Sequence, residues 1–347
     1  MRVYEIDPTC DPRWPVFVDG HPKASVFHGT AWLKALRNTY GYGPVAFTTS
    51  PPAAQLRNAI VFCHVNSWIT GHRLVSLPFS DHCEPLCDAS ADLAALLEHL
   101  RSASNERKWK HLEIRPVSES FRQLCDGFAQ SERYLFHVLD LRPDVGSLFQ
   151  SFDKDSVQRR VRRAERAGLI EQCGTSAVLL EDFYRLFTIT RRRHGLPPTP
   201  RSWFENLVQE HGRSAEVRIA YAGRKPISAI LTFRFGKVAY YKYGCSDYAF
   251  NRLGATPWLF WGAIQAAKSS GCLEFDMGRT ADNHTGLLAF KKNWVSQPRE
   301  LTYWSFPRST ATLSSEGWKL KVANRVFASM PKSMLEITGR LIYRHIG

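Results

Sequence analysis

The pattern of apolar positions divides the chain into two blocks of strands and helices. In residues 1–142, short runs rich in β-branched and aromatic residues take turns with stretches of helical periodicity. The elements predicted in this block are a helix at 30–38, strands at 45–49, 58–65 and 73–77, a helix at 89–103, and strands at 111–115 and 134–141. This order favours a layered α+β or α/β domain with a mixed sheet.

The second block has a different order of elements. Two helices in 178–211 are separated by Arg191–Pro200, because its Gly-Leu-Pro-Pro run must break a helix. The elements predicted after them are strands at 215–222, 226–235 and 237–243, a helix at 256–269, a strand at 273–277, a short helix ending at residues 290–292, and a strand at 301–304. For 347 residues we expect two domains, 1–142 and 143–308, followed by a basic tail, 309–347.

An arginine-rich helix is predicted at the start of the second block. Asp155 or Ser156 can cap it, and Gly168 can end it. A step of 100° per residue puts Val157, Val161, Ala164 and Gly168 on one side and four arginines on the other. These are Arg159, Arg162, Arg163 and Arg166, which we call the arginine stripe. The stripe is either an anion-binding surface or a solvated helix face.

Composition narrows the function classes. A net charge of +14 implies contact with phosphates, nucleic acid or an anionic membrane surface. No signal peptide pattern and no run of 18 apolar residues occurs, so a cytoplasmic location is expected. The eight cysteines lack framework spacing, and Cys83 and Cys87 are one residue too far apart for a C-x-x-C hook. We therefore predict no metal and no cofactor.

Lys291 is the residue on which the chemistry of the second block centres. It follows an apolar helix face and precedes Trp294, so its ammonium should be partly desolvated, where it would act strongly on developing negative charge. The alternative is a cation at a helix C-terminus, which the helix dipole favours. Judged on this stretch alone, the second interpretation is the better one.

Five segments in order resemble a known family. They are TITRRRHGLPPTP, YYKYGCSD (Tyr240–Asp247), LGATPWLFWGAIQAAKSSG (Leu253–Gly271), FDMGR (Phe275–Arg279) and GLLAFKKNWV (Gly286–Val295). Together they resemble the Fem-type transferases, which add amino acids from aminoacyl-tRNA to peptidoglycan precursors. The resemblance covers roughly residues 145–305 well and the first domain only loosely. It implies an α+β protein of tandem GNAT-like domains, each a mixed, mainly antiparallel sheet flanked by helices.

The resemblance also suggests residue roles. In that family the lysine of a Phe-Lys pair stabilises the oxyanion, which maps onto Lys291 after Phe290. Apart from the resemblance, the residues themselves offer Asp276, and Asp282 or His284 on the following turn, as candidates to accept the proton of the attacking amine. The candidate substrate-binding residues are Arg192, His194, Tyr241, Tyr243, Arg279 and Phe290. Because no nucleophile elbow or Cys–His pair is evident, direct attack in a ternary complex is favoured.

The loop Arg252–Pro257 departs from GNAT enzymes that bind acetyl-CoA. Thr256 replaces the second glycine of their phosphate loop, and Pro257 lacks an amide donor. The first hypothesis is therefore transfer from aminoacyl-tRNA to an amine of an envelope precursor. The alternatives are an N-acyltransferase of exopolysaccharide or envelope lipids with a thioester donor, and a non-catalytic nucleic-acid-binding protein. The sequence does not give the oligomeric state.

The tail, 309–347, mixes six Lys or Arg and two Glu with apolar residues. Such a segment can lie in the interface of the inner membrane. It can equally be a helix that docks on the rest of the protein.

Overall fold

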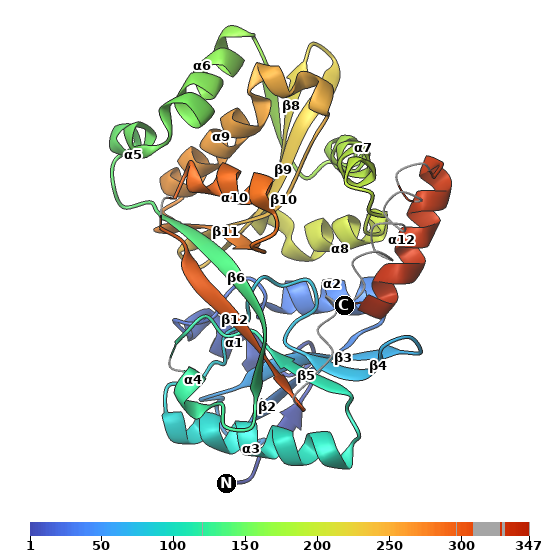
Figure 1. Cartoon of the computed structure of the whole chain (residues 1–347). Helices are drawn as coiled ribbons and strands as arrows, with labels where there is room; N and C mark the ends of the chain where they lie inside the picture. Colours follow the sequence, from blue (N-terminus) through green and yellow to red (C-terminus); the bar gives the residue numbers. More distant parts are fainter. Residues whose placement is uncertain (120, 296, 308–326, 328–329, 347) are drawn as a thin grey trace. The chain divides into compact units, whose positions relative to one another are not determined.

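The computed structural model describes every residue except 120, 296, 308–326, 328–329 and 347 (Figure 1). The chain forms two compact units. Unit 1 is Met1–Tyr134 with the described parts of 300–316 and 341–347; unit 2 is Leu135–Arg299 with the described part of 317–340. Most of the tail therefore lies outside the described residues.

Unit 1 is a mixed sheet with helices. Its elements are β1 (Tyr4–Ile6), α1 (Arg13–Gly20), α2 (Thr30–Tyr40), β2 (Gly43–Thr48), β3 (Ile60–Ser67), β4 (Gly71–Val75), α3 (Ser90–Glu106), β5 (His111–Ile114), α4 (Phe121–Leu124) and β12 (Arg299–Phe306), with the first half of β6 (Ala129–Asp140). The strand order is β1-β2-β3-β4-β5-β12-β6, and β4 and β5 run parallel. Apolar residues of α3, including Leu96 and Leu100, pack on Phe47 and Phe62 of the sheet. The final strand, β12, pairs with β5 and therefore belongs to this unit. The sequence analysis had instead predicted it at the end of the second domain.

A buried histidine lies in the core of unit 1. His28 Nδ1 accepts a hydrogen bond from the Ser25 amide at 3.0 Å, and Nε2 donates to the Glu84 carbonyl at 2.9 Å. These partners select the neutral tautomer protonated at Nε2. Burial, partly offset by the bond to Glu84, lowers the pKa of His28 to about 4.

Unit 2 contains the arginine helix and the Lys291 segment. Its elements are α5 (Val145–Ser151), the π-helical turn η1 (Lys154–Gln158), α6 (Arg159–Arg166), β7 (Ile170–Gly174), α7 (Ala177–Arg193), α8 (Arg201–His211), the 3₁₀ turn η2 (Gly212–Ser214), β8 (Ala215–Ala222), β9 (Lys225–Phe235), β10 (Val238–Ser246), the 3₁₀ turn η3 (Tyr248–Leu253), α9 (Ala255–Ser269), β11 (Glu274–Thr280) and α10 (Thr285–Lys292). The strand order is β6-β11-β10-β9-β8-β7, and of the pairs in this order only β10 and β11 run parallel within the described residues. The predicted α+β class with mainly antiparallel sheets is confirmed.

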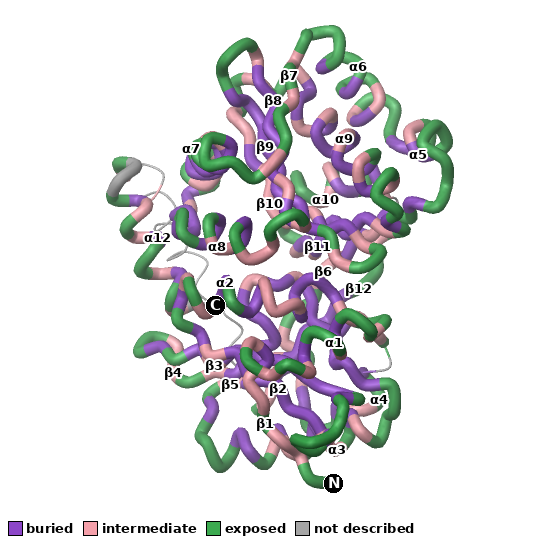
Figure 2. The backbone as a smooth tube through the Cα atoms, turned by 180° about the vertical axis from the view of Figure 1, so that it is seen from behind, coloured by how far each residue is buried: buried purple, intermediate pink, exposed green. Residues whose placement is uncertain are grey.

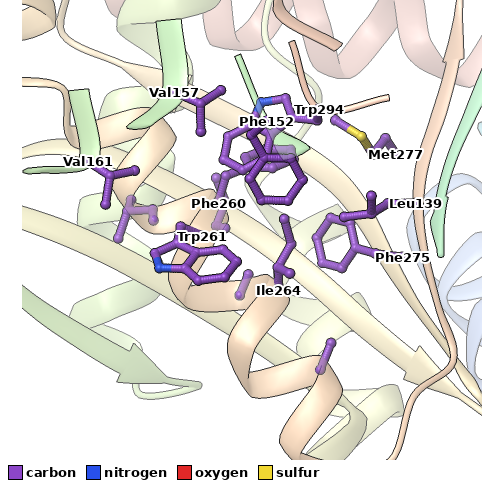
Figure 3. Close-up of a cluster of buried hydrophobic side chains, with 14 of the residues drawn as sticks. Leu139, Phe152, Val157, Val161, Phe260, Trp261, Ile264, Phe275, Met277 and Trp294 are labelled. Atoms are coloured by element: carbon purple, nitrogen blue, oxygen red, sulfur yellow. The ribbon is translucent and has the colours of Figure 1, made fainter. Parts of the chain in front are cut away.

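Helices cover both faces of the unit 2 sheet (Figure 1). On one face α9 packs Phe260 and Ile264 against Phe275 and other strand residues, with Trp294 beside Phe152 and Phe260 (Figure 3). On the other face α7 and α8 contribute Phe183, Phe187 and Phe204, whose rings lie 4.8–6.1 Å apart. Figure 2 shows the buried strands between the more exposed helices.

The arginine helix begins differently from the prediction. Asp153, and not Asp155 or Ser156, caps it by accepting bonds from the amides of those two residues at 3.0 and 2.6 Å. The segment then passes through η1 before α6 begins. Val157, Val161 and Ala164 are buried, as the helical step predicted.

The last described helix is α12 (Lys332–Ile346). Gly339 packs so closely on the loop after α7 in unit 2 that a Cβ there would lie 2.0 Å from the Pro198 carbonyl oxygen. In unit 1, the Tyr343 carbonyl accepts a bond from Tyr42 at 3.0 Å. These are the contacts expected of a docking helix.

Candidate functional site

Strands β10 and β11 diverge in unit 2. They pair in parallel only over Val238–Tyr240 and Glu274–Asp276. Beyond Asp276, β11 has a bulge, where its pairing with β6 moves from Asp276 to Arg279. The ends of both strands therefore lack each other as hydrogen-bonding neighbours.

Lys291 holds the bulge of β11. Its side chain projects from α10, and the residue is only 2% exposed. The ammonium Nζ donates to the carbonyls of Gly278 at 2.8 Å and Arg279 at 3.0 Å. The expected desolvation of Lys291 is thus present, and the carbonyls fix the position of its charge.

The two candidate carboxylates differ in environment. Asp276 is buried, and its Oδ1 accepts a bond from the Gly278 amide at 2.6 Å, so it pins the same bulge as Lys291. Asp282 lies on the exposed turn between β11 and α10. Arg279 is half-buried at the end of β11.

A bulge in β10 separates the two candidate tyrosines. The pairing of β10 with β9 shifts between Tyr241 and Tyr243, so residues two apart no longer share a face. Tyr241 packs on Phe260 of α9, with ring centroids 4.4 Å apart. Tyr243 packs on Phe204 of α8, and its hydroxyl accepts a bond from Trp203 at 2.7 Å. The two residues lie on opposite faces, so they cannot form one binding surface together.

A cavity of about 400 Å³ opens at the start of α9 within unit 2. Its lining is mostly polar and includes two arginines and no carboxylate. The lining residues are Ser156, Arg160, Arg193, Ile227, Ser228, Ser246, Phe250, Asn251, Ala255, Thr256, Pro257, Gly286, Phe290 and Asn293. Positive charge and the N-terminus of a helix both favour an anionic or strongly polar ligand.

The wall of the cavity is held in place by short contacts. Ser228 Oγ and Thr256 Oγ1 lie 2.9 Å apart, and Thr190 of α7 bonds to the amide and the carbonyl of Ser246 at 2.9 and 3.1 Å. Gly254 has φ of +79°, and a Cβ there would lie 2.3 Å from the Arg160 carbonyl oxygen. The loop before α9 therefore depends on glycine to approach the backbone of α6.

The cavity includes one of the predicted site residues, Phe290, which lies next to Lys291. Arg192 and His194 are exposed at the end of α7, and the adjacent Arg193 lines the cavity instead. Although the residue is exposed as a whole, partial desolvation of its ring, then the charges of Arg193, Arg191 and His284, lower the pKa of His194, so the ring is neutral at pH 7.

The arginine stripe is exposed and does not line the cavity. Arg159 pairs with Asp155 at 2.6 Å, while Arg163 donates to the Arg252 carbonyl at 3.2 Å. Sequence reasoning missed Arg160, which does line the cavity. The signal was available, because the helical step puts Arg160 only about 40° from Ala164, beside the apolar face.

Comparisons with known proteins agree with this geometry. A family model described as an acetyltransferase (GNAT) domain matches residues 152–292, from the residue before Asp153 to the end of α10. No curated protein sequence matches the chain. Unit 2 thus contains the segment that matches the GNAT domain model, and Lys291 and most of the residues that line the cavity lie inside the matched range.

Solved structures share the fold of most of the chain. FemX superposes with a TM-score of 0.69 at 16% identity, covering 88% of this chain and 97% of FemX. L-PGS from Bacillus licheniformis gives 0.57 at 12% identity, covering 94% and 98%. A tandem GNAT protein from the clavulanic acid biosynthesis pathway gives 0.55 at 11% identity, covering 88% and 97%. The Fem-like, tandem GNAT fold expected from the sequence is confirmed.

No described helix has both the length and the apolar character needed to span a membrane.

Proposed function

We propose that this chain is an N-acyltransferase that moves an aminoacyl group from aminoacyl-tRNA to an amine of a peptidoglycan or other envelope precursor. The observation that carries the proposal is the buried ammonium of Lys291, fixed by two carbonyls where β11 leaves β10. A fixed cation in a poorly solvated place acts on charge that develops during a reaction. The fold shared with FemX supports the aminoacyl chemistry that the resemblance to the Fem-type transferases implies.

The reaction requires a tetrahedral intermediate. The acceptor amine attacks the carbonyl carbon of the donor ester, and the carbonyl oxygen takes up negative charge. Lys291 stabilises that oxyanion, the amine loses a proton, and the carbonyl re-forms as the ester oxygen of the tRNA leaves. Asp282, exposed on the neighbouring turn, is the candidate acceptor of the proton, which it then gives to the departing ester oxygen so that the tRNA leaves with a free hydroxyl. Asp276 positions the Gly278 segment to which Lys291 binds.

We assign donor binding to the cavity at the start of α9. Arg160 and Arg193 would hold a phosphate, and Thr256 and Ser228 offer hydroxyls. The arginine stripe would contact the tRNA backbone outside it, since only Arg159 of the four has a carboxylate partner among the described residues.

A second candidate function is N-acyl transfer from a thioester. The specific observation in its favour is that Ala255, Thr256 and Pro257, the end of the loop Arg252–Pro257 and the start of α9, line the cavity, and a helix N-terminus can bind a pyrophosphate. Pro257 still removes one amide from that helix start, so we rank this candidate second.

The test compares donors directly. Purified full-length protein is incubated with an envelope extract and either tRNA charged with labelled amino acids or a panel of labelled acyl-CoA thioesters. Aminoacyl transfer to an extractable amide supports the first candidate. Transfer from a thioester alone would replace it with the second, and tRNA binding without transfer from any donor would refute both.

The stripe gives a further test of the donor. Replacing Arg162, Arg163 and Arg166 with Gln should lower the slope of log affinity against log salt for tRNA by about 2 to 3. An unchanged slope would identify the stripe as a solvated surface.

A further inference from the structure

Tyr248 is an exposed aromatic residue close to the cavity of unit 2. It lies on the turn η3 and is 68% exposed, and no other aromatic residue is as exposed among the described residues of unit 2. Phe250 and Asn251, which follow it on the same turn, both line the cavity. The donor-binding role proposed above leaves this ring without a use.

Arg193 connects the ring of Tyr248 to the cavity. Its guanidinium carbon lies over the ring, 5.4 Å from the centroid, and Arg193 is one of the two arginines that line the cavity. Such a cation–π contact favours one arrangement of the two side chains, although both are exposed. The ring of Tyr248 therefore lies at the rim of the cavity with a guanidinium beside it.

Short contacts fix the turn that carries Tyr248. Asp247 caps η3, because its carboxylate accepts a bond from the Ala249 amide at 3.1 Å. The Asp247 amide donates to the carbonyl of Ile227, a residue of the cavity wall, at 2.9 Å. The Asp247 carboxylate also pairs with Lys225 at 3.2 Å. The backbone of the turn is thus ordered by contacts within unit 2, so a ligand has little order to impose on it.

The rim and the cavity together favour a nucleotide. A phosphate matches the two arginines and the helix start, but it makes no use of an exposed aromatic ring. A nucleobase does, because every base has a flat π-face that stacks on an aromatic side chain. A nucleobase linked to phosphates therefore fits the ring and the cavity at the same time.

We propose that Tyr248 and Arg193 form a stacking platform for the terminal nucleobase of the donor, whose phosphates enter the cavity beside Arg160. This inference rests on the donor-binding role proposed for the cavity above. The 3′ end of tRNA and coenzyme A both carry an adenine close to phosphates, so the platform fits either source. The experiment separates the two.

Binding of two probes to the full-length protein tests the platform. The probes are the trinucleotide CCA, which is the 3′ end of tRNA, and coenzyme A, each titrated by calorimetry. Removing an aromatic ring that stacks on a base usually lowers affinity about 5- to 150-fold. We therefore expect Tyr248→Ala to bind the recognised probe at least about tenfold more weakly than wild type. Tyr248→Phe keeps the ring and should stay within about threefold.

Further measurements separate stacking from charge. For CCA, a trinucleotide that lacks the terminal base should bind wild type as weakly as intact CCA binds Tyr248→Ala. Arg160→Gln should lower the slope of log affinity against log salt, whereas Tyr248→Ala should leave it unchanged, because a tyrosine neutralises no phosphate. Trp68→Ala is the matched control, since Trp68 is 86% exposed and lies in unit 1. Circular dichroism melting checks that every variant is folded.

The possible results lead to different conclusions. If wild type and Tyr248→Ala bind a probe equally well, this inference is wrong and the cavity remains the donor site. An equal loss of affinity in Trp68→Ala would also overturn it. If neither probe binds wild type, the donor-binding role of the cavity fails as well. Loss of coenzyme A binding in Tyr248→Ala, with no binding of CCA to any variant, would keep the platform and assign it to a thioester donor.

Discussion

Replacing Lys291 with Gln separates its charge from its hydrogen bonds. The wild-type ammonium donates to the Gly278 and Arg279 carbonyls, which lie in the buried bulge of β11. Loss of the donor leaves each carbonyl with a desolvation cost of about 1 to 3 kcal/mol, so Lys291→Met should destabilise unit 2. Gln is shorter but retains an N–H donor, so Lys291→Gln should be the more stable of the two variants.

Catalysis should respond to the charge. Removing a group that stabilises an oxyanion typically lowers turnover by about 10² to 10³, or about 2.7 to 4 kcal/mol. We therefore expect Lys291→Gln to lose at least a hundredfold in the rate of amide formation while KM stays within a few-fold of wild type. Lys292→Gln is the matched control, because Lys292 is the next residue of α10 and is exposed.

The assay is single-turnover amide formation, run well below the melting temperature with the folded fraction checked by circular dichroism. If Lys291→Gln is folded and keeps more than about a tenth of wild-type turnover, its charge is not used in catalysis. The same holds if Lys292→Gln loses as much. In either case Lys291 only fastens the β11 bulge to α10.

Three other predictions concern the cavity and the core. Gly254→Ala should lower the free energy of unfolding by more than Gly168→Ala does. Both glycines have a positive φ, where an alanine costs about 1 to 2 kcal/mol, but only at Gly254 would the new Cβ also meet a carbonyl oxygen. Urea unfolding of the two variants measures the difference. Arg160→Gln should raise the KM for the donor about tenfold, while Arg159→Gln should not, because Arg159 lies outside the cavity. If titrations with the donor show equal effects of the two changes, the donor does not bind in the cavity. The pKa of His28 is lowered to about 4, so between about pH 6.5 and 4 the unfolded state binds one more proton than the folded state. The free energy of unfolding should therefore fall by up to about 3 kcal/mol as the pH drops through that window. His28→Gln should flatten the plot of stability against pH.

The sequence predicted regular elements better than irregular ones. The predicted strand at 215–222 matches β8, and α9 begins one residue before the predicted start. The apolar residues of both elements recur with a clear period, because each packs on a core. Strand β7 was missed because it is a mostly exposed edge strand, without buried positions to mark it.

The site was harder to predict than the fold. The bulge in β10 has no sequence signature, so the sequence could not show that Tyr241 and Tyr243, both candidate substrate-binding residues, face opposite ways. The apolar surroundings of Lys291 predicted its desolvation, and the family resemblance suggested its role. Its carbonyl partners come from β11, and such pairing depends on tertiary structure. The cavity could not be foreseen, because it joins residues of α6, α7, β9 and the loop before α9.

The approach of Gly254 to Arg160 has an evolutionary consequence. The contact on the Arg160 side is made by the main-chain oxygen, so it constrains position 254 and leaves the side chain at position 160 open to replacement. Lineages that keep this helix crossing should retain glycine at 254, while residue 160 diverges as the preferred donor changes. An alignment of relatives would then pair an invariant position with a variable one, and the variable position would be the one that tracks donor choice.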